Sequence, residues 1–152
     1  MLIGAPRSIF NPYEWLPGYG ESTVSFRSEG MDVVLEVGYE REAPDDERDE
    51  AITMLTREIR FSRVHSLIKQ PFPGSTLFAF DAGSGRYTLG ELTEFTQSDW
   101  VAGSLAAWQS ISSHTPPSLR HFSIQFMAEN VAFHVLAEDV VLLEERRVVH
   151  AG

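Results

Sequence analysis

The amino-acid sequence predicts a mainly β fold of the α+β class, with about seven or eight antiparallel strands and one amphipathic helix. Two observations lead to this class. Apolar and polar residues alternate with a period of two in several segments, which is typical of half-buried strands. The segment Trp100–Ser112 instead has apolar residues at helical spacing. We expect a sandwich or a strongly bent sheet, and a closed β-barrel is the alternative.

The first twenty residues are rich in proline and aromatic side chains. Proline disfavours regular structure, whereas large aromatic side chains are rarely left in water. Residues 1–20 are therefore predicted to form an extended arm of a single globular domain that spans residues 1–152. Phe10, Tyr13 and Trp15 should pack over the domain and cover an edge of the sheet.

The first clear strand pair surrounds a turn at residues 28–30, and five apolar residues alternate from Met31 to Tyr39 on its second strand. Residues 51–64 fit a helix or a strand, and β-branched and aromatic residues favour a strand over Arg57–Val64.

Two short apolar segments, Leu77–Phe80 and Arg86–Leu89, flank the glycine-rich loop Asp81–Gly85 and predict a hairpin. A short strand over Leu92–Phe95 should follow it.

The helix over Trp100–Ser112 should begin at a capping residue. Thr96 and Asp99 have the spacing of a capping box, and Ser98 is the alternative N-cap. One arc of about 140° carries the large side chains of the helix, so we expect Trp100 and Trp108 to be largely buried. The members of that arc are Trp100, Val101, Ser104, Leu105, Trp108 and Ile111.

The opposite face of this helix consists of small and uncharged residues. No charged residue occurs from Trp100 to Ser113, although surface helices ordinarily carry charges. We expect this face to be covered by the domain's own loops or N-terminal arm, or by a partner or second subunit. Ala102 and Ala106 are the candidate contact residues, and a homodimer is one alternative.

The last hairpin joins two alternating segments, and a final strand over Val140–Leu143 follows it. The core-facing residues are Phe122, Ile124, Phe126, Val131, Phe133 and Val135. A two-residue turn at Glu129-Asn130 would pair residues whose numbers add to 259, because asparagine tolerates the left-handed conformation of such turns.

This register places His121 opposite Glu138, which should raise the pKa of His121. It also separates His121 from His134 by about 13 Å, so the two would not share a metal. Both histidines lie on the face that we expect to be less buried. The alternative register, in which paired numbers add to 257, places His134 opposite Ser123 and brings the two rings closer.

The 152 residues contain no cysteine, which excludes disulfides, thiolate catalysis and iron–sulfur clusters. Neither a signal peptide nor a transmembrane run is evident, so we expect a cytoplasmic protein. A formal net charge of −10 disfavours nucleic acid and anionic membranes as ligands and favours basic partners.

Half of this net charge lies between Glu40 and Glu50, where seven acidic residues accompany two arginines. The segment, which contains Pro44, should be a solvated loop between strands or a contact surface for a basic partner. The candidate partner-binding residues are Asp45, Asp46, Glu47, Asp49 and Glu50.

No motif assigns a catalytic residue, a metal ligand or a cofactor. The five histidines lack zinc-ligand spacing, and Asp81–Gly85 departs from calcium-binding and phosphate-binding loops. The Ser66-Leu67-Ile68-Lys69 match to a serine-nucleophile motif lacks its companion motifs and falls in a predicted strand.

The sequence therefore favours a non-enzymatic acidic interaction protein, such as an inhibitor or immunity-like protein that binds a basic protein. A β domain that binds a small apolar ligand and a hydrolase with a dispersed acid/base site are the two alternatives.

Overall fold

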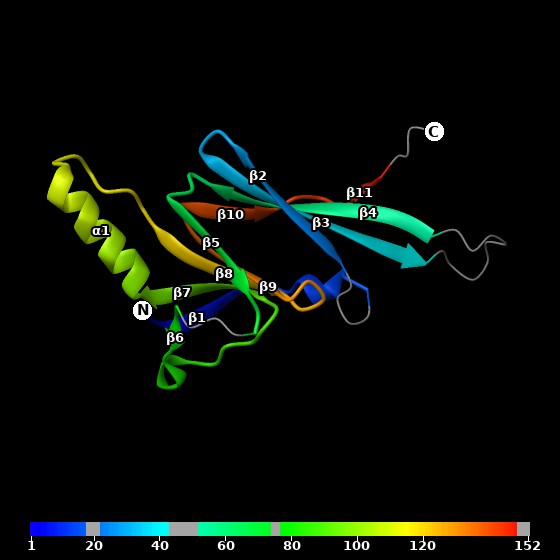
Figure 1. The fold of residues 1–152 in the computed structure, drawn as a ribbon, viewed down its shortest axis with the longest axis horizontal. Coiled ribbons are helices and arrows are strands. Elements are labelled where there is room, and N and C mark those ends of the chain that lie inside the picture. The colour runs from blue at the N-terminus through cyan, green and yellow to red at the C-terminus, as the bar shows by residue number, and fades with distance from the viewer. Residues whose placement is uncertain (18–21, 43–51, 74–76, 149–152) are drawn as a thin grey trace.

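Two β-sheets and one helix make up the fold in the computed structural model, which describes residues 1–17, 22–42, 52–73 and 77–148 (Figure 1). The first sheet has the strand order β5-β9-β8-β7-β1-β6, and the second has the order β10-β4-β3-β2, with β11 also paired to β4. The strands are β1 (Leu2–Phe10), β2 (Thr23–Glu29), β3 (Asp32–Glu42), β4 (Ile52–Ser62), β5 (Ser66–Pro71), β6 (Ala79–Phe80), β7 (Leu92–Ser98), β8 (Arg120–Phe126), β9 (Val131–Ala137), β10 (Asp139–Leu142) and β11 (Arg146–Arg147). The helix α1 spans Asp99–Ile111.

The chain crosses between the two sheets at two neighbouring places. β4 of the second sheet leads into β5 of the first, and β9 of the first sheet leads into β10 of the second. Ser62 of β4 pairs with Asp139 of β10, and Ser66 of β5 pairs with Leu136 of β9. Between these pairs Arg63 adopts a positive φ of 49°, and the His65 amide donates to the Leu136 carbonyl at 2.8 Å. The predicted mainly β fold with a strongly bent sheet is thus confirmed.

The core lies between the sheets and follows the alternation in the sequence. Leu35, Val37 and Tyr39 of β3 are at most 2% exposed, and the corresponding faces of β8 and β9 meet them from the first sheet. The predicted core-facing residues of the last hairpin are all buried. The strand expected over Arg57–Val64 is longer at its start and ends at the bend, as β4 (Ile52–Ser62).

The other face of β8 and β9 is also buried, contrary to the expectation for His121 and His134, which are 0% and 6% exposed. These strands are central in the first sheet, and Phe78, Tyr87 and Gly90 contact this face. The Phe78 ring is 4.3 Å from that of His134, and the Gly90 amide donates to Gln125 at 3.0 Å.

The N-terminal segment, expected to be an extended arm, forms the strand β1 over residues 2–10, with a register shift between Ser8 and Phe10. It pairs antiparallel with β7 and, at Leu2 and Ile3, parallel with β6. Trp15, farther along, packs on Tyr39 with ring centroids 5.3 Å apart.

The hairpin predicted from Leu77–Phe80 and Arg86–Leu89 is wrong. β6 (Ala79–Phe80) pairs with β1, and residues 86–89 form no strand. Between them Asp81 caps a short 3-10 turn, Ala82–Ser84, by accepting from the Gly83 amide at 3.0 Å. β6 therefore pairs with β1, and not with residues 86–89 as the hairpin would require.

Candidate functional site

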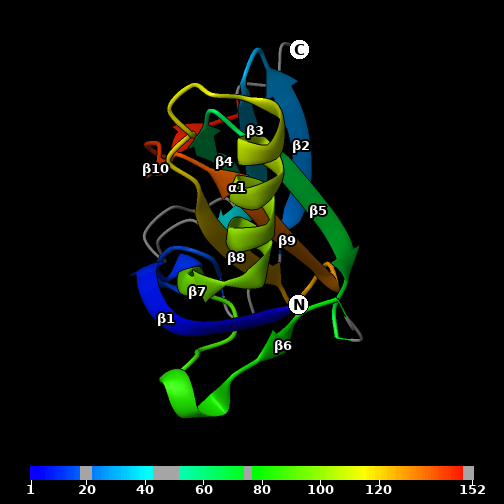
Figure 2. The ribbon, with the colours of Figure 1, turned by 90° about the vertical axis from the view of Figure 1, so that its left-hand side faces the viewer.

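The helix α1 stands at one end of the molecule, in front of the ends of several strands (Figures 1 and 2). Its position was predicted correctly, and the alternative N-cap, Ser98, is the one used. Ser98 has extended φ and ψ, and its Oγ accepts from the Val101 amide at 3.3 Å. Thr96, the other candidate cap, instead donates its hydroxyl to the Ala5 carbonyl.

A chain of hydrogen bonds ties the start of α1 to the first sheet. Ser98 Oγ lies 2.8 Å from His121 Nδ1, and His121 Nε2 lies 2.9 Å from His134 Nδ1. These contacts require β8 and β9 to pair as Ser123 with His134, which is the alternative register. The favoured register, with paired numbers adding to 259, is wrong.

The turn between β8 and β9 explains this difference. Phe126 pairs with Val131 and closes a loop of four residues rather than two. Asn130 does adopt a left-handed conformation, with φ of 51°, but as the last residue of that longer loop. His121 accordingly lies opposite Leu136 and not Glu138, which contacts Arg63 at 3.7 Å.

Aromatic rings surround the two histidines. The ring centroids of Phe78, Phe95 and Trp100 lie 5.0, 5.4 and 5.1 Å from that of His121. Burial lowers the pKa of His121 to about 3, with a smaller contribution from His134, and burial lowers the pKa of His134 to about 4. Both rings are therefore neutral at pH 7, and the expected rise in the pKa of His121 is wrong.

The chain Ser98–His121–His134 has the spacing of a nucleophile, a base and an orienting group. A general base works best with a pKa near the working pH, and His121 lies well below it. The third group is a neutral imidazole, which lacks the charge with which a carboxylate stabilises an imidazolium. The chain is better suited to fixing the start of α1 than to transferring protons.

A metal centre has no support either. Among the residues that the structure describes, no three His, Cys, Asp or Glu side chains are grouped closely enough to hold a metal ion. The histidine pair therefore lacks the further protein ligands of ordinary zinc sites.

The inner side of α1 faces the sheets only loosely. Trp100, Val101, Ser104, Leu105 and Trp108 are partly buried, and no residue of the helix is fully buried. Ile111, expected on the same buried arc, is 83% exposed, because it lies in the last turn, at the end of the helix away from Ser98.

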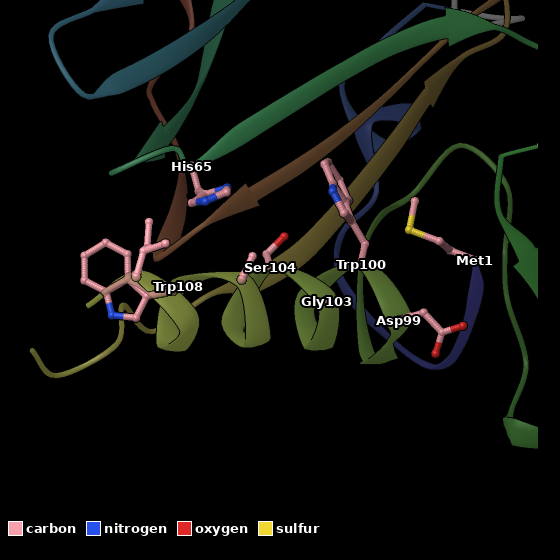
Figure 3. A pocket seen from close by; sticks show the side chains of 9 residues that line it. Met1, His65, Asp99, Trp100, Gly103, Ser104 and Trp108 are labelled. Carbon is pink, nitrogen blue, oxygen red and sulfur yellow. The ribbon is translucent and has the colours of Figure 1, made fainter. Parts of the chain in front are cut away.

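A groove of about 410 Å³ runs along one side of α1, and we call it the tryptophan groove (Figure 3). Trp108 stands near one end of the groove, Met1 and Asp99 lie toward the other end beyond Trp100, and His65 approaches from the start of β5. The small residues Gly103 and Ala107 also line it. Ser104 and Ile111 complete the lining.

A smaller hollow of about 310 Å³ flanks the other side of α1, between the helix and the strands β7 and β8. Val101, Leu105 and Leu119 provide apolar walls. Its acidic residue, Glu94, is 8% exposed and accepts from Arg120 at 2.8 Å, which lowers the pKa of the carboxyl. The opposite charges of Glu94 and Arg120 in this hollow therefore neutralise each other.

The small-residue face of α1 is exposed. Ala102 and Ala106, the predicted contact residues, are both exposed, as are Gly103, Ala107 and Ser110. Within the described residues the chain itself does not provide the cover that was expected for this face.

The predicted acidic residues Asp45, Asp46, Glu47, Asp49 and Glu50 lie outside the described residues. The strand ends that flank them, at Glu42 and Ile52, lie at the end of the molecule remote from α1 (Figure 1). The described strand ends that flank the acidic segment and the helix α1 thus lie at opposite ends of the molecule (Figure 1).

The remaining candidates from the sequence are three histidines and the Ser66–Lys69 segment. His65 and His114 are exposed, and His150 lies outside the described residues. The Ser66–Lys69 segment belongs to strand β5, as expected, so the helix that the nucleophile motif needs is absent there.

Comparison of the chain with protein-family models, curated proteins and solved structures finds no match. No helix in the described ranges has the length and hydropathy to cross a membrane.

Proposed function

We propose that this chain is a non-enzymatic binding protein that recognises a basic partner protein with helix α1. One observation carries the proposal: α1 exposes an uncharged surface from Trp100 to Ile111, flanked on one side by the largely apolar tryptophan groove and on the other by the smaller, partly polar hollow. Exposed apolar surface rimmed by polar residues is typical of interaction sites. Ile111 at 83% and Met1 at 44% exposure both line the tryptophan groove.

The charge of the chain supports a basic partner. The formal net charge is −10, and six of the described arginines already form ion pairs with carboxylates of the same chain. The chain as a whole therefore keeps a net negative field. Such a field attracts basic proteins and speeds their association at low salt.

The test is capture of binding proteins from an extract of the source cells by the tagged full chain at low salt. We expect at least one basic protein to be retained by the wild type and released as the salt concentration rises. Ala106→Arg should abolish its retention. Ser25→Arg, an exposed substitution of equal charge on β2, should not.

Retention that is equal for the two arginine variants would place the binding surface elsewhere. If the wild type retains no basic protein at any salt concentration, the proposed function is wrong.

A small apolar ligand is the second candidate, and the tryptophan groove favours it. Its volume of about 410 Å³ falls within the range of small-molecule sites. Native mass spectrometry of freshly purified protein should then show a bound compound that is lost in Gly103→Leu, because the new side chain would enter the groove. A spectrum with the bare chain alone would reject this candidate.

A further inference from the structure

We propose that the partner presents a basic amphipathic helix, which lies along the small-residue face of α1 and inserts large apolar side chains into the tryptophan groove. This inference rests on the proposed function and adds the conformation and chemistry of the segment that is recognised.

The exposed face of α1 has the shape that a second helix requires. Ala102, Ala106 and Ser110 form one row at spacings of four, and Gly103 and Ala107 form the next. Helices pack by placing the ridges of one between such rows of the other, at axis separations of about 8–10 Å. Short side chains along two adjacent rows favour the closest of these approaches.

The tryptophan groove lies beside these rows and provides space for the bulky apolar side chains of a second helix. Gly103 and Ala107 belong both to the exposed face and to the groove lining. A helix seated on the face would therefore have large side chains directly above the groove, between Trp100 and Trp108. The contact would also remove Ile111 from water, which is 83% exposed in the free chain.

The ends of α1 indicate the charge of the partner. Asp99 lies in the first turn, where a carboxylate complements the helix dipole, but the last turn contains no basic residue. The carboxyl end of α1 therefore keeps its partial negative charge beside Ile111 and attracts a lysine or arginine of the partner.

A second copy of the chain fits this surface less well. It would bring the same net charge of −10 and another helix without basic residues from Trp100 to Ser113. A basic helix from another protein satisfies both the charge and the shape.

Synthetic peptides of about eighteen residues test the inference against the full-length, isotope-labelled protein. The first has leucine and lysine in an amphipathic helical pattern, the second replaces lysine by glutamate, and the third carries two central prolines in the lysine peptide. We expect binding of the first peptide, with NMR shifts centred on α1 and the Trp108 indole. The second should not bind, and the third should bind at least about tenfold more weakly.

Gly103 provides a matched pair of variants. A Cβ at this position meets no atom within 4 Å, so Gly103→Ala and Gly103→Leu should both fold, with α1 intact by circular dichroism. Gly103→Ala should bind the lysine peptide as the wild type does. Gly103→Leu should weaken binding at least about tenfold, because its side chain enters the tryptophan groove.

Several outcomes would overturn the inference. Equal binding of the proline and helical peptides would show that helical conformation is not recognised. Unchanged binding by Gly103→Leu, or shifts confined to the residues that flank 43–51, would remove α1 from the site. A wild-type dimer that Ala106→Arg dissociates would make a second copy the occupant. If a basic partner is captured from extract but no helical peptide binds, the inference fails and the proposed function stands.

Discussion

Lowering the pH from about 7.5 to 5 should destabilise the folded protein through its buried histidine pair. The pKa values of His121 and His134 are lowered from an ordinary 6.5 to about 3 and about 4, because both rings are buried. Below pH 6.5 the unfolded chain therefore binds protons at these two sites while the folded chain does not. Protons then favour unfolding, so the free energy of unfolding falls with the pH.

The expected magnitude follows from the ordinary pKa of the unfolded rings. Each histidine that is protonated only in the unfolded chain lowers the free energy of unfolding by up to about 1.4 kcal/mol per pH unit. For two histidines, the loss between pH 7.5 and 5 amounts to about 4 kcal/mol. This value requires only that both folded pKa values lie below 5.

Urea unfolding at several pH values measures this loss directly. His134→Gln keeps an amide that can bond to His121 and should about halve the loss, because one titrating ring remains. The double variant with His121→Gln as well should remove it. His114→Gln, at an exposed position, is the control and should retain the wild-type loss.

Equal stability of the wild type at both ends of this pH range would refute the reasoning, as would an undiminished loss in the double variant. Three carboxyl groups with a lowered pKa, those of Glu29, Glu94 and Glu145, affect the stability in more acidic solution. The pKa of Glu94 is lowered from 4.5, chiefly by its hydrogen bond from Arg120. The stability it contributes is therefore present above pH 4.5 and is lost only in more acidic solution.

Three further substitution experiments test the packing of the chain and its acidic segment. Phe122→Ala should cost about 3–5 kcal/mol in urea unfolding, because the ring is fully buried, and Trp108→Ala should cost less than about 3 kcal/mol. Gly90→Ala should cost more than Gly30→Ala, because both have positive φ but only at Gly90 would the Cβ lie 2.5 Å from the Tyr13 ring. Neutralising the acidic segment should leave the unfolding midpoint nearly unchanged, whereas a loss of several kcal/mol would show that these carboxylates are structurally paired. The residues replaced by Ser or Asn are Asp45, Asp46, Glu47, Asp49 and Glu50.

The elements that could be predicted are those whose apolar residues recur with a clear period in the sequence. In β3 the residues Leu35, Val37 and Tyr39 are buried on one face, and the period of two is visible in the sequence. The helix α1 was equally clear, because a capping residue precedes it and Pro116 follows it. The place of Ala102 and Ala106 on the face opposite the tryptophans followed from the helical period, but this face was expected to be covered and is exposed in the described molecule.

Strand partners distant in the sequence could not be predicted. Pro6 favoured an arm over a strand, but β6 pairs with β1 only at Leu2 and Ile3. From Pro6 onward β1 is therefore an edge strand, where proline is tolerated. The local signal for a hairpin around Asp81–Gly85 was likewise overridden, because β1 offered β6 a partner from the start of the chain.

The contact between His121 and His134 depends on the register of β8 and β9, which the period of two in the sequence does not determine. Both registers of β8 and β9 direct Phe122 and Phe133 to the core, since a shift of two residues leaves every side chain on its own face. Only the length of the connecting loop separates them, and four residues rather than two bring His121 within 2.9 Å of His134.

The same register accounts for the exposure of the proposed binding surface. His121 holds Ser98 through Nδ1 because His134 occupies its other nitrogen, and Ser98 is the residue at which α1 begins. The helix is thus fixed at its first residue to the most buried polar group of the sheet, while its last turn extends to Ile111, which is 83% exposed. The hydrogen bonds at its first residue hold the orientation of α1 even though none of its residues is fully buried. The small-residue face and the tryptophan groove can then remain open to a partner without loss of the fold, because the core between the sheets contains no residue of α1.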